Sequence, residues 1–367
     1  MLLRCASRSG TIAWRMSLHV DLEINGLDEA SLHAGAKTIA LRVHPGWSED
    51  KLQYQVYTSG ITNQLIGVWQ EERDRQLLVR VYGQGTDLFI DRDAERRNIE
   101  VLHKVGCSPE LRAVFNNGIS YAFTVGIPTT PALIVEEPVW RAVAREMAKF
   151  HKTAIEVSSR GGDKTQPSLF PKIRHFLSLI PEKFDGAKQE RLEERNYTKS
   201  LLDQETSGLE KCLTTLHCPV VFSHNDILLG NVIWDQATTK ASFIDFEYGA
   251  PNYQPYDIGN HFNEFAGVDE VDYNLYPSAA FQHQWLRSYL AHYHERDPEE
   301  VEEEEVEQWY VWTNKFALAS HLFWGVWALV QAHYSKIDFD FLGYGIIRLD
   351  EYFRRKDEFL SLSPKEK

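Results

Sequence analysis

The sequence predicts an α+β fold with two lobes, a small β-rich amino-terminal lobe followed by a large, mainly helical one. Residues 53–125 have the composition of strands joined by short polar turns, whereas helical periodicity dominates the later part of the chain. A proline-rich connector separates the two patterns. We expect residues 1–20 to be a disordered tail or leader, 21–127 the first lobe and 128–367 the second.

The first lobe is expected to contain five strands and one helix. Asn116-Asn117-Gly118 between two β-rich runs is a strong hairpin signal, and a Gly, Ser and Asn turn separates the first two strands. Gly83-Gln84-Gly85 is expected to be a plain turn, since no complete G-x-G-x-x-G follows. The strands are expected at 53–57, 65–69, 76–82, 111–115 and 120–125, with the helix at 91–105.

The second lobe is expected to be helical with a few inserted strands. Apolar residues recur with helical period after Trp140, and the acidic run 299–307 is typical of a solvated helix start. The apolar run 316–330 is too short for a membrane span, which needs ~20 residues, so we expect a buried helix there. Short strands are expected at 220–222 with 232–234, and at 241–244.

Composition narrows the function. The chain has 367 residues, with 39 Lys and Arg against 53 Asp and Glu, a net charge of -14 that disfavours nucleic acid and anionic membrane surfaces. We therefore expect no nucleic-acid partner and no stable membrane insertion. The four cysteines form no C-x-x-C pair, which indicates reduced thiols in a cytoplasmic protein.

The first residues leave alternatives open. Arg4, Arg8 and Arg15 without an acid before Asp21 weakly match a mitochondrial presequence. A disordered tail, or translation from Met16, explains the same residues, so the identity of residues 1–15 stays open.

The sharpest chemical signal is the run VFSHNDILLGNVIWD, in which His224, Asp226 and Asn231 stand as H-x-D-x-x-x-x-N between two apolar strands. A phosphotransferase needs a carboxylate to align an acceptor hydroxyl and an amide oxygen to bind Mg²⁺, and kinase catalytic loops have this spacing. Nineteen positions after Asp226, Asp245-Phe246-Glu247 closes another strand, where kinases carry a second metal ligand. The alternative, a turn-forming Asp226 and a helix-capping Asp245, explains each motif alone but not the ordered pair.

At these residues the sequence resembles the choline/ethanolamine kinases, a branch of the protein-kinase-like fold, over roughly residues 34–356. The stretch FIDFEYGAPNYQPYDIGNHFNEFAGVDEVDYNLYPS, residues 243–278, is similar to the family signature. The segments FNEFAG and VDYNLYPS are more similar to the ethanolamine kinases of this family than to its choline kinases.

The resemblance implies ATP and Mg²⁺ as cofactors and assigns roles to the motif residues. Asp226 is then the base or hydroxyl-positioning residue, and Asn231 and Asp245 are Mg²⁺ ligands, with Glu247 assisting at the metal. Hard Mg²⁺ prefers such carboxylate and amide oxygens together with phosphate.

For the nucleotide, we expect Arg80 at the end of a strand to pair with Glu95 at the start of the next helix. An arginine fits this family, and its planar fork suits phosphate oxygens. Gly60, Thr62 and Asn63 are expected to form the turn that covers the phosphates. A surface salt bridge and a plain hairpin are the alternatives.

The connector that contacts adenine is expected at residues 121–126. Ala122 departs from the acidic residue of relatives, which leaves backbone hydrogen bonds as the expected contact and nucleoside preference open.

For the acceptor, the resemblance points to Glu264, Trp324, Trp327 and Tyr344, because a carboxylate and aromatic faces can hold the cation of an amino alcohol. The two tryptophans are three residues apart, on one helix face. Ordinary core packing for the tryptophans and a helix-surface position for Glu264 are the alternatives.

We therefore expect phosphorylation of ethanolamine by ATP, with ATP and ethanolamine as the partners. A choline or dual choline/ethanolamine kinase, another small-molecule phosphotransferase and a non-catalytic scaffold of kinase shape remain as rivals. The oligomeric state stays open, with a homodimer among the options.

Overall fold

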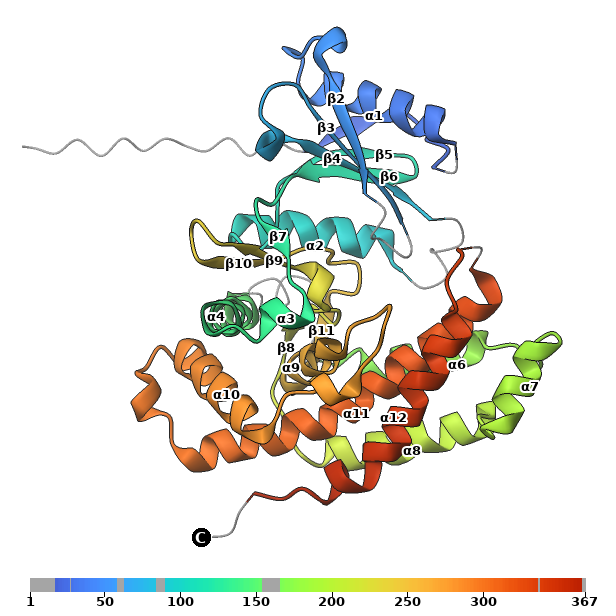
Figure 1. Ribbon diagram of the computed structural model, residues 1–367, viewed down its shortest axis with the longest axis vertical. Helices are drawn as coiled ribbons and strands as arrows, with labels where there is room; N and C mark the ends of the chain where they lie inside the picture. The colour runs from blue at the N-terminus through green and yellow to red at the C-terminus, as the bar shows by residue number, and fades with distance from the viewer. Residues whose placement is uncertain are drawn as a thin grey trace, which may run out of the picture.

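A β-sheet lies at one end of the molecule and a large group of helices at the other, with α2, β9 and β10 between them (Figure 1). The computed structural model describes residues 17–26, 28–57, 63–83, 90–153, 166–335 and 337–364. This arrangement confirms the predicted two-lobed α+β architecture. The lobe boundary predicted after residue 127 falls inside a short strand, β7 (Ile127–Pro128), which pairs with the second lobe.

In the described part of the chain, six strands form the sheet of the small lobe in the order β1-β5-β6-β4-β3-β2. All neighbours are antiparallel except β1 and β5, which are parallel. The strands are β1 (Leu18–Val20), β2 (Gln53–Tyr57), β3 (Asn63–Trp69), β4 (Leu77–Tyr82), β5 (Leu111–Phe115) and β6 (Gly118–Ala122).

Within its described residues, the small lobe contains one strand and one α-helix that were not predicted. Residues 18–20 form β1 and do not belong to a tail, and α1 (Glu29–Val43) covers the sheet. β1 is too short to show periodicity, and α1 buries mostly alanine and glycine, which weakens its amphipathic pattern. Asp28 caps α1 by accepting a hydrogen bond from the Ser31 amide at 3.1 Å.

The Asn116-Asn117-Gly118 hairpin is confirmed, but its second strand is β6 at 118–122 and not 120–125. Pairing starts at the glycine of the turn. Only glycine fits at this position, because a Cβ on Gly118 would lie 2.2 Å from the carbonyl oxygen of Arg80 in β4. The close approach sets β6 beside the strand that carries Arg80.

Outside the six-stranded sheet, the described residues form two small sheets. The predicted strands at 232–234 and 241–244 pair as β9 (Val232–Asp235) and β10 (Lys240–Phe243), with β7 on the other side of β9. The strand at 220–222 is present as β8 (Val220–Ser223), but it pairs with an unpredicted strand, β11 (Ala250–Tyr253), and not with β9. The sequence did not predict β11 because the segment contains Pro251, and proline is tolerated in a strand only at a sheet edge.

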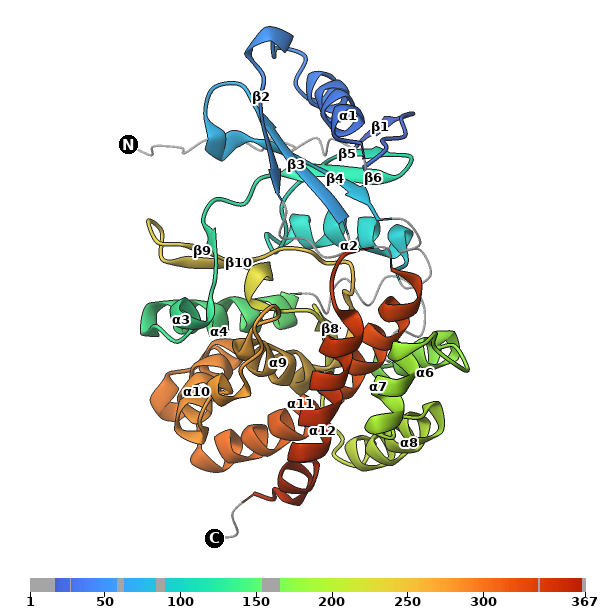
Figure 2. The same ribbon diagram turned by 45° about the vertical axis from the view of Figure 1, so that its right-hand side comes forward.

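The helices of the second lobe surround a long central one, α11, which packs against α9 and α12 (Figure 2). α11 contains the predicted buried run 316–330. At Gly259 of α9 a Cβ would meet the backbone of α11, 2.6 Å from the carbonyl oxygen of Thr313, so glycine permits the contact. The main helices are α2 (Arg92–Lys104), α3 (Pro131–Ile134), α4 (Glu137–Thr153), α6 (Leu169–Leu179), α7 (Ala187–Glu194), α8 (Lys199–Thr214), α9 (Gln254–Asn263), α10 (Ala279–His294), α11 (Glu303–Tyr334) and α12 (Phe341–Ser361).

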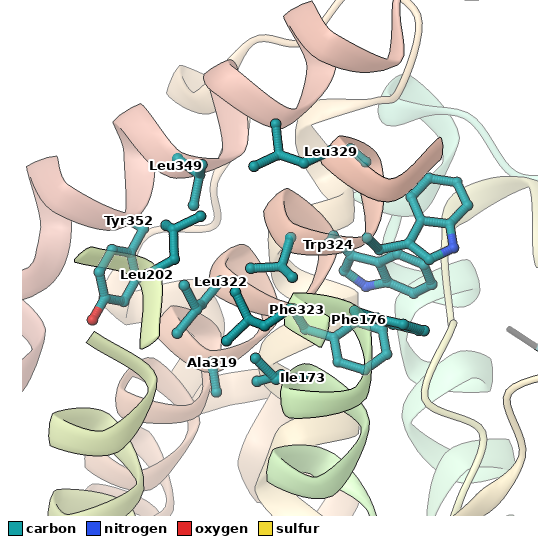
Figure 3. Close-up of a cluster of buried hydrophobic side chains, with 14 of the residues drawn as sticks. Ile173, Phe176, Leu202, Ala319, Leu322, Phe323, Trp324, Leu329, Leu349 and Tyr352 are labelled. Atoms are coloured by element: carbon teal, nitrogen blue, oxygen red, sulfur yellow. The ribbon is translucent and has the colours of Figure 1, made fainter. Parts of the chain in front are cut away.

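The largest apolar cluster lies between α6, α8, α11 and α12. Figure 3 shows Trp324 at one edge of this cluster, beside Phe323 and Phe176. The tryptophans predicted to hold the acceptor are therefore rooted in the main core. No helix in the described ranges is at once long and apolar enough to cross a bilayer.

Candidate active site

The loop between β8 and β9 brings the H-x-D-x-x-x-x-N residues together. The side-chain nitrogen of Asn231 donates to the backbone oxygen of Asp226 at 2.9 Å and to its Oδ2 at 3.2 Å. His224 bonds the carbonyl oxygen of Ile244 through Nε2 at 2.9 Å, which ties the loop to the residue before Asp245. The motif spacing thus corresponds to one hydrogen-bonded turn.

The carboxylate of Asp257 in α9 holds this loop in place through hydrogen bonds. Its two carboxylate oxygens accept hydrogen bonds from the backbone amides of His224, at 2.7 Å, and Asn225, at 2.6 Å. The side chain of His151 in α4 contacts the same carboxylate at 3.0 Å, and the side chains of both His151 and Asp257 are buried. Asn225 has a φ of 68°, a left-handed conformation that the two amide contacts hold in place.

Arg80 of β4 in the small lobe contacts Asp245, which follows β10 in the large lobe. Its guanidinium forms ion pairs with Glu95 of α2 and, at 2.5 Å, with Asp245. Arg80 is 4% exposed, so the alternative of a surface salt bridge is wrong for this pair. Asp245 itself has a φ of 65°, an uncommon conformation for a residue other than glycine that directs its side chain from the end of the strand.

Arg92 at the start of α2 adds a second cation. It donates to Glu247 at 2.9 Å and to Glu95 at 3.0 Å, and Asn63 donates to Glu247 at 3.3 Å. One carboxylate oxygen each from Glu95, Asp245 and Glu247 lies within 4.8 Å of the others, a donor set suited to a hard cation. We call this cluster the charged junction, and it consists of Arg80, Arg92, Glu95, Asp245 and Glu247.

The charged junction and the β8–β9 loop that carries Asp226 together hold more acids than arginines. Burial raises the pKa of Asp226 well above its ordinary value, and the charges of Asp245, Glu264 and Glu247 raise it further. Burial and Asp245 also raise the pKa of Glu247, while Arg80 and Arg92 oppose the shift. A bound cation relieves this repulsion, so the residues present fit Mg²⁺.

Glu264 follows α9 directly and lies in the interior. It is 3% exposed and pairs with Arg348 of α12 at 2.6 Å, so the alternative of a helix-surface acid is wrong. Arg348 also donates to the hydroxyl of Tyr344 at 3.2 Å. The carboxylate and one predicted aromatic residue are therefore in contact with the same guanidinium.

Trp324 and Trp327 meet edge to face, with ring centroids 5.3 Å apart. Trp324 also packs against Tyr248, three residues after Asp245, with centroids 5.1 Å apart. The pair is thus both part of the core, as the alternative held, and adjacent to the segment that carries the acids. We call Trp324, Trp327, Tyr344, Glu264 and Arg348 the aromatic wall.

Two predicted residues, Gly60 and Thr62, lie outside the described residues, whereas Asn63 begins β3 beside the charged junction. In the connector, Ala122 is the last residue of β6, and its backbone amide bonds the carbonyl oxygen of Glu110 at 2.9 Å.

Several residues of the site carry no local sequence signal. Arg92 and Arg348 are each one of three arginines in their helices, so nothing in the sequence singles them out, and Asp257 and Asn260 stand within the longer signature at residues 243–278 without a motif of their own. Lys172 of α6 donates to the carbonyl oxygen of Tyr248 at 3.3 Å, and burial lowers its pKa to about 8. A lone acid between two large apolar residues, as Asp257 is between Tyr256 and Ile258, is the signal that could have found one of them.

Solved structures define the class of this fold. The Plasmodium vivax ethanolamine kinase has a TM-score of 0.76 over 89% of both chains at 28% identity. The choline kinase of Cryptosporidium parvum has a TM-score of 0.74 over 90% of this chain and 98% of that one, and at 23% identity it shows the fold alone. The chain is a kinase-like phosphotransferase in its architecture.

Sequence comparison gives the family. The choline/ethanolamine kinase family model matches residues 55–353. Ethanolamine kinase 1 of Mus musculus is 40% identical over 347 residues, which are 94% of each chain. The chain belongs to the choline/ethanolamine kinase family, as its motifs predicted.

Proposed function

We propose that the protein transfers the γ-phosphoryl group of ATP to the hydroxyl of ethanolamine, with Mg²⁺ as the metal cofactor. The observation that carries the proposal is the buried contact between Arg80 of the small lobe and Asp245 of the large one, next to the Asp226–Asn231 turn. Similarity to ethanolamine kinases over most of the chain supports this acceptor.

Asp226 is the residue that accepts the proton of the acceptor hydroxyl. Its raised pKa describes the site without a cation, and positive charge nearby returns it to the carboxylate form that accepts a proton. Asn231 uses its side-chain nitrogen to hold Asp226, so the amide oxygen is the atom that would bind metal. The same turn therefore positions the base and one metal ligand.

Asp245 and Glu247 would hold Mg²⁺ with Asn231. Bound Mg²⁺ supplies positive charge that offsets the charge developing on the transferring phosphoryl group. Arg80, oriented by Glu95, is placed to contact phosphate oxygens with its planar fork. Asn63, which donates to Glu247, is the described residue of the proposed turn over the phosphates.

The aromatic wall holds the ammonium end of the acceptor. Trp324, Trp327 and Tyr344 offer aromatic faces, each contributing about 0.5–2 kcal/mol to a cation, and Glu264 offers a hydrogen-bond acceptor. A primary ammonium needs such an acceptor, whereas a trimethylammonium group needs only the faces. The buried carboxylate therefore favours ethanolamine, and the ring pair keeps choline as a second candidate acceptor.

The test is a direct comparison of ethanolamine and choline as acceptors, with the phosphorylated product measured by ³¹P NMR across a range of Mg²⁺ concentrations. We expect product with ethanolamine, a lower kcat/KM with choline, and no product without Mg²⁺. A higher kcat/KM for choline would reassign the acceptor. Absence of product with every amino alcohol would favour a non-catalytic scaffold.

A further inference from the structure

A continuous chain of hydrogen bonds joins two members of the aromatic wall, the carboxylate of Glu264 and the indole of Trp324. Arg348 links Glu264, at 2.6 Å, to the hydroxyl of Ser320, at 3.0 Å. Ser320 donates to Oδ1 of Asn260 at 2.8 Å, and the indole nitrogen of Trp324 donates to the same oxygen at 2.8 Å. Four elements take part: α9, the turn that follows it, α11 and α12.

The chemistry of these groups fixes the direction of the chain. Arginine and the indole nitrogen can only donate hydrogen bonds. Ser320 must therefore accept from Arg348 and pass its own proton to Asn260. Asn260 must in turn present its oxygen to both Ser320 and Trp324, so neither the amide nor the hydroxyl can reverse.

Burial makes the chain rigid. Asn260 and Ser320 are 0% exposed, so water does not compete for their hydrogen bonds. A buried polar group that loses its partner is costly, so the hydrogen bonds that Asn260 and Ser320 make favour one arrangement of these side chains. Gly259 brings α9 against α11 at this level, which sets Asn260 within reach of both Ser320 and Trp324.

We propose that Asn260 and Ser320 are positioning residues for the acceptor, a role that rests on the proposed function. Asn260 fixes the plane of the Trp324 ring, and Ser320 fixes Arg348 and through it the carboxylate of Glu264. Together they set the separation between the aromatic face and the carboxylate. A small primary ammonium can use both groups, the ring face and the carboxylate.

The two residues act on different ends of the wall, and this gives the proposal a distinguishing signature. Loss of the Ser320 hydroxyl releases Arg348 and Glu264, so binding of ethanolamine suffers more than binding of choline. Loss of the Asn260 oxygen releases the Trp324 ring, so both acceptors suffer. A residue with a merely structural role would affect ATP and the acceptors alike.

The experiment measures kcat and KM for ethanolamine, choline and ATP in Ser320→Ala, with Ser320→Thr as the conservative rescue. We expect KM for ethanolamine to rise about tenfold, KM for choline to change less than about threefold, and kcat and KM for ATP to stay near wild type. Ser320→Thr keeps the hydroxyl and should recover most of the loss. Ser288→Ala, which removes a buried hydroxyl from α10, is the matched control and should leave all constants unchanged.

Asn260→Ser is the second variant, and it keeps the proposal testable if Ser320→Ala folds poorly. Serine is chosen because it is small and polar. We expect KM to rise for both acceptors, by about tenfold, with KM for ATP unchanged. Unchanged acceptor KM values in a folded variant, or equal losses for acceptors and ATP, overturn the positioning role. Wild-type protein that phosphorylates no amino alcohol overturns the proposed function first, and the inference with it.

Discussion

The charged junction and the aromatic wall solve the same problem, a buried charge, in opposite ways. The junction combines two arginines with three acids from both lobes, and further acids in the catalytic loop and at Glu264 leave the region short of positive charge. The wall lies within the large lobe and pairs one arginine with one carboxylate. The difference suggests that the first region is built to receive cations and the second to keep its shape.

The largest expected effect concerns the base. Asp226→Ala should lower turnover of ethanolamine by about 10² to 10⁴-fold, because proton transfer to a positioned side chain contributes a factor of this size. Stability should not fall, since the change removes an acid that burial and its neighbours disfavour. Steady-state kinetics and urea unfolding measure the two quantities. Asp203→Ala, an exposed acid on α8, is the control, and near-normal turnover in Asp226→Ala would remove the base from the mechanism.

The next prediction separates the two regions by stability. Arg348→Met leaves Glu264 buried without its partner and should lower the free energy of unfolding by about 3–5 kcal/mol. Arg80→Met should cost less, because Asp245 is partly exposed and Arg92 still contacts Glu95. Urea unfolding with and without Mg²⁺ measures both, and Mg²⁺ should restore stability only in Arg80→Met. Recovery of both variants by Mg²⁺ would erase the contrast between the regions.

A smaller effect is expected at the metal. Asp245→Asn should raise the Mg²⁺ concentration needed for half-maximal activity by about tenfold, because an amide is a weaker ligand than a carboxylate. KM for ethanolamine should change little, since the wall is independent of this residue. The measurement is a Mg²⁺ titration at saturating ATP and ethanolamine. A wild-type titration curve would exclude Asp245 as a ligand.

The most gradual effect is a pH dependence of stability. Burial lowers the pKa of His261 to about 4, and burial together with Arg348 lowers the pKa of His321, so both are neutral in the folded chain. The unfolded chain binds protons at histidine below about pH 6.5. The free energy of unfolding should therefore fall as pH drops from about 6.5 towards 4, by up to ~1.4 kcal/mol per pH unit for each histidine. Urea unfolding of wild type and His261→Asn over this range measures the slope, which should be shallower in the variant.

Local patterns predicted the parts of the site that are local in the chain. The spacing of Asp226 and Asn231 corresponds to a single turn, and the pairing of Arg80 with Glu95 follows the strand-to-helix ion pair that the kinase resemblance implies. The fold class followed from the order of strand-like and helical segments. These features need no knowledge of which distant segments meet.

The features that the sequence did not predict depend on distant contacts. β1 and β11 are strands only because β5 and β8 lie beside them, and β11 contains a proline that argues against a strand. Arg348 differs from its neighbours on α12 only because it meets Glu264, 84 positions earlier in the chain. Residues of this kind are visible once the helices are packed.

The ten-residue helix α9 serves both substrates of the proposed reaction. Near its start Asp257 fixes the catalytic loop, towards its end Asn260 holds an indole, and the chain then continues directly into Glu264. A single helix, packed closely against α11 at Gly259, therefore sets the distance that the phosphoryl group must cross. A side chain added at Gly259 would move the residues that position the phosphoryl donor and those that position the acceptor at the same time. A change in specificity for one substrate alone is therefore expected at other residues of α9 or at the surfaces that face it.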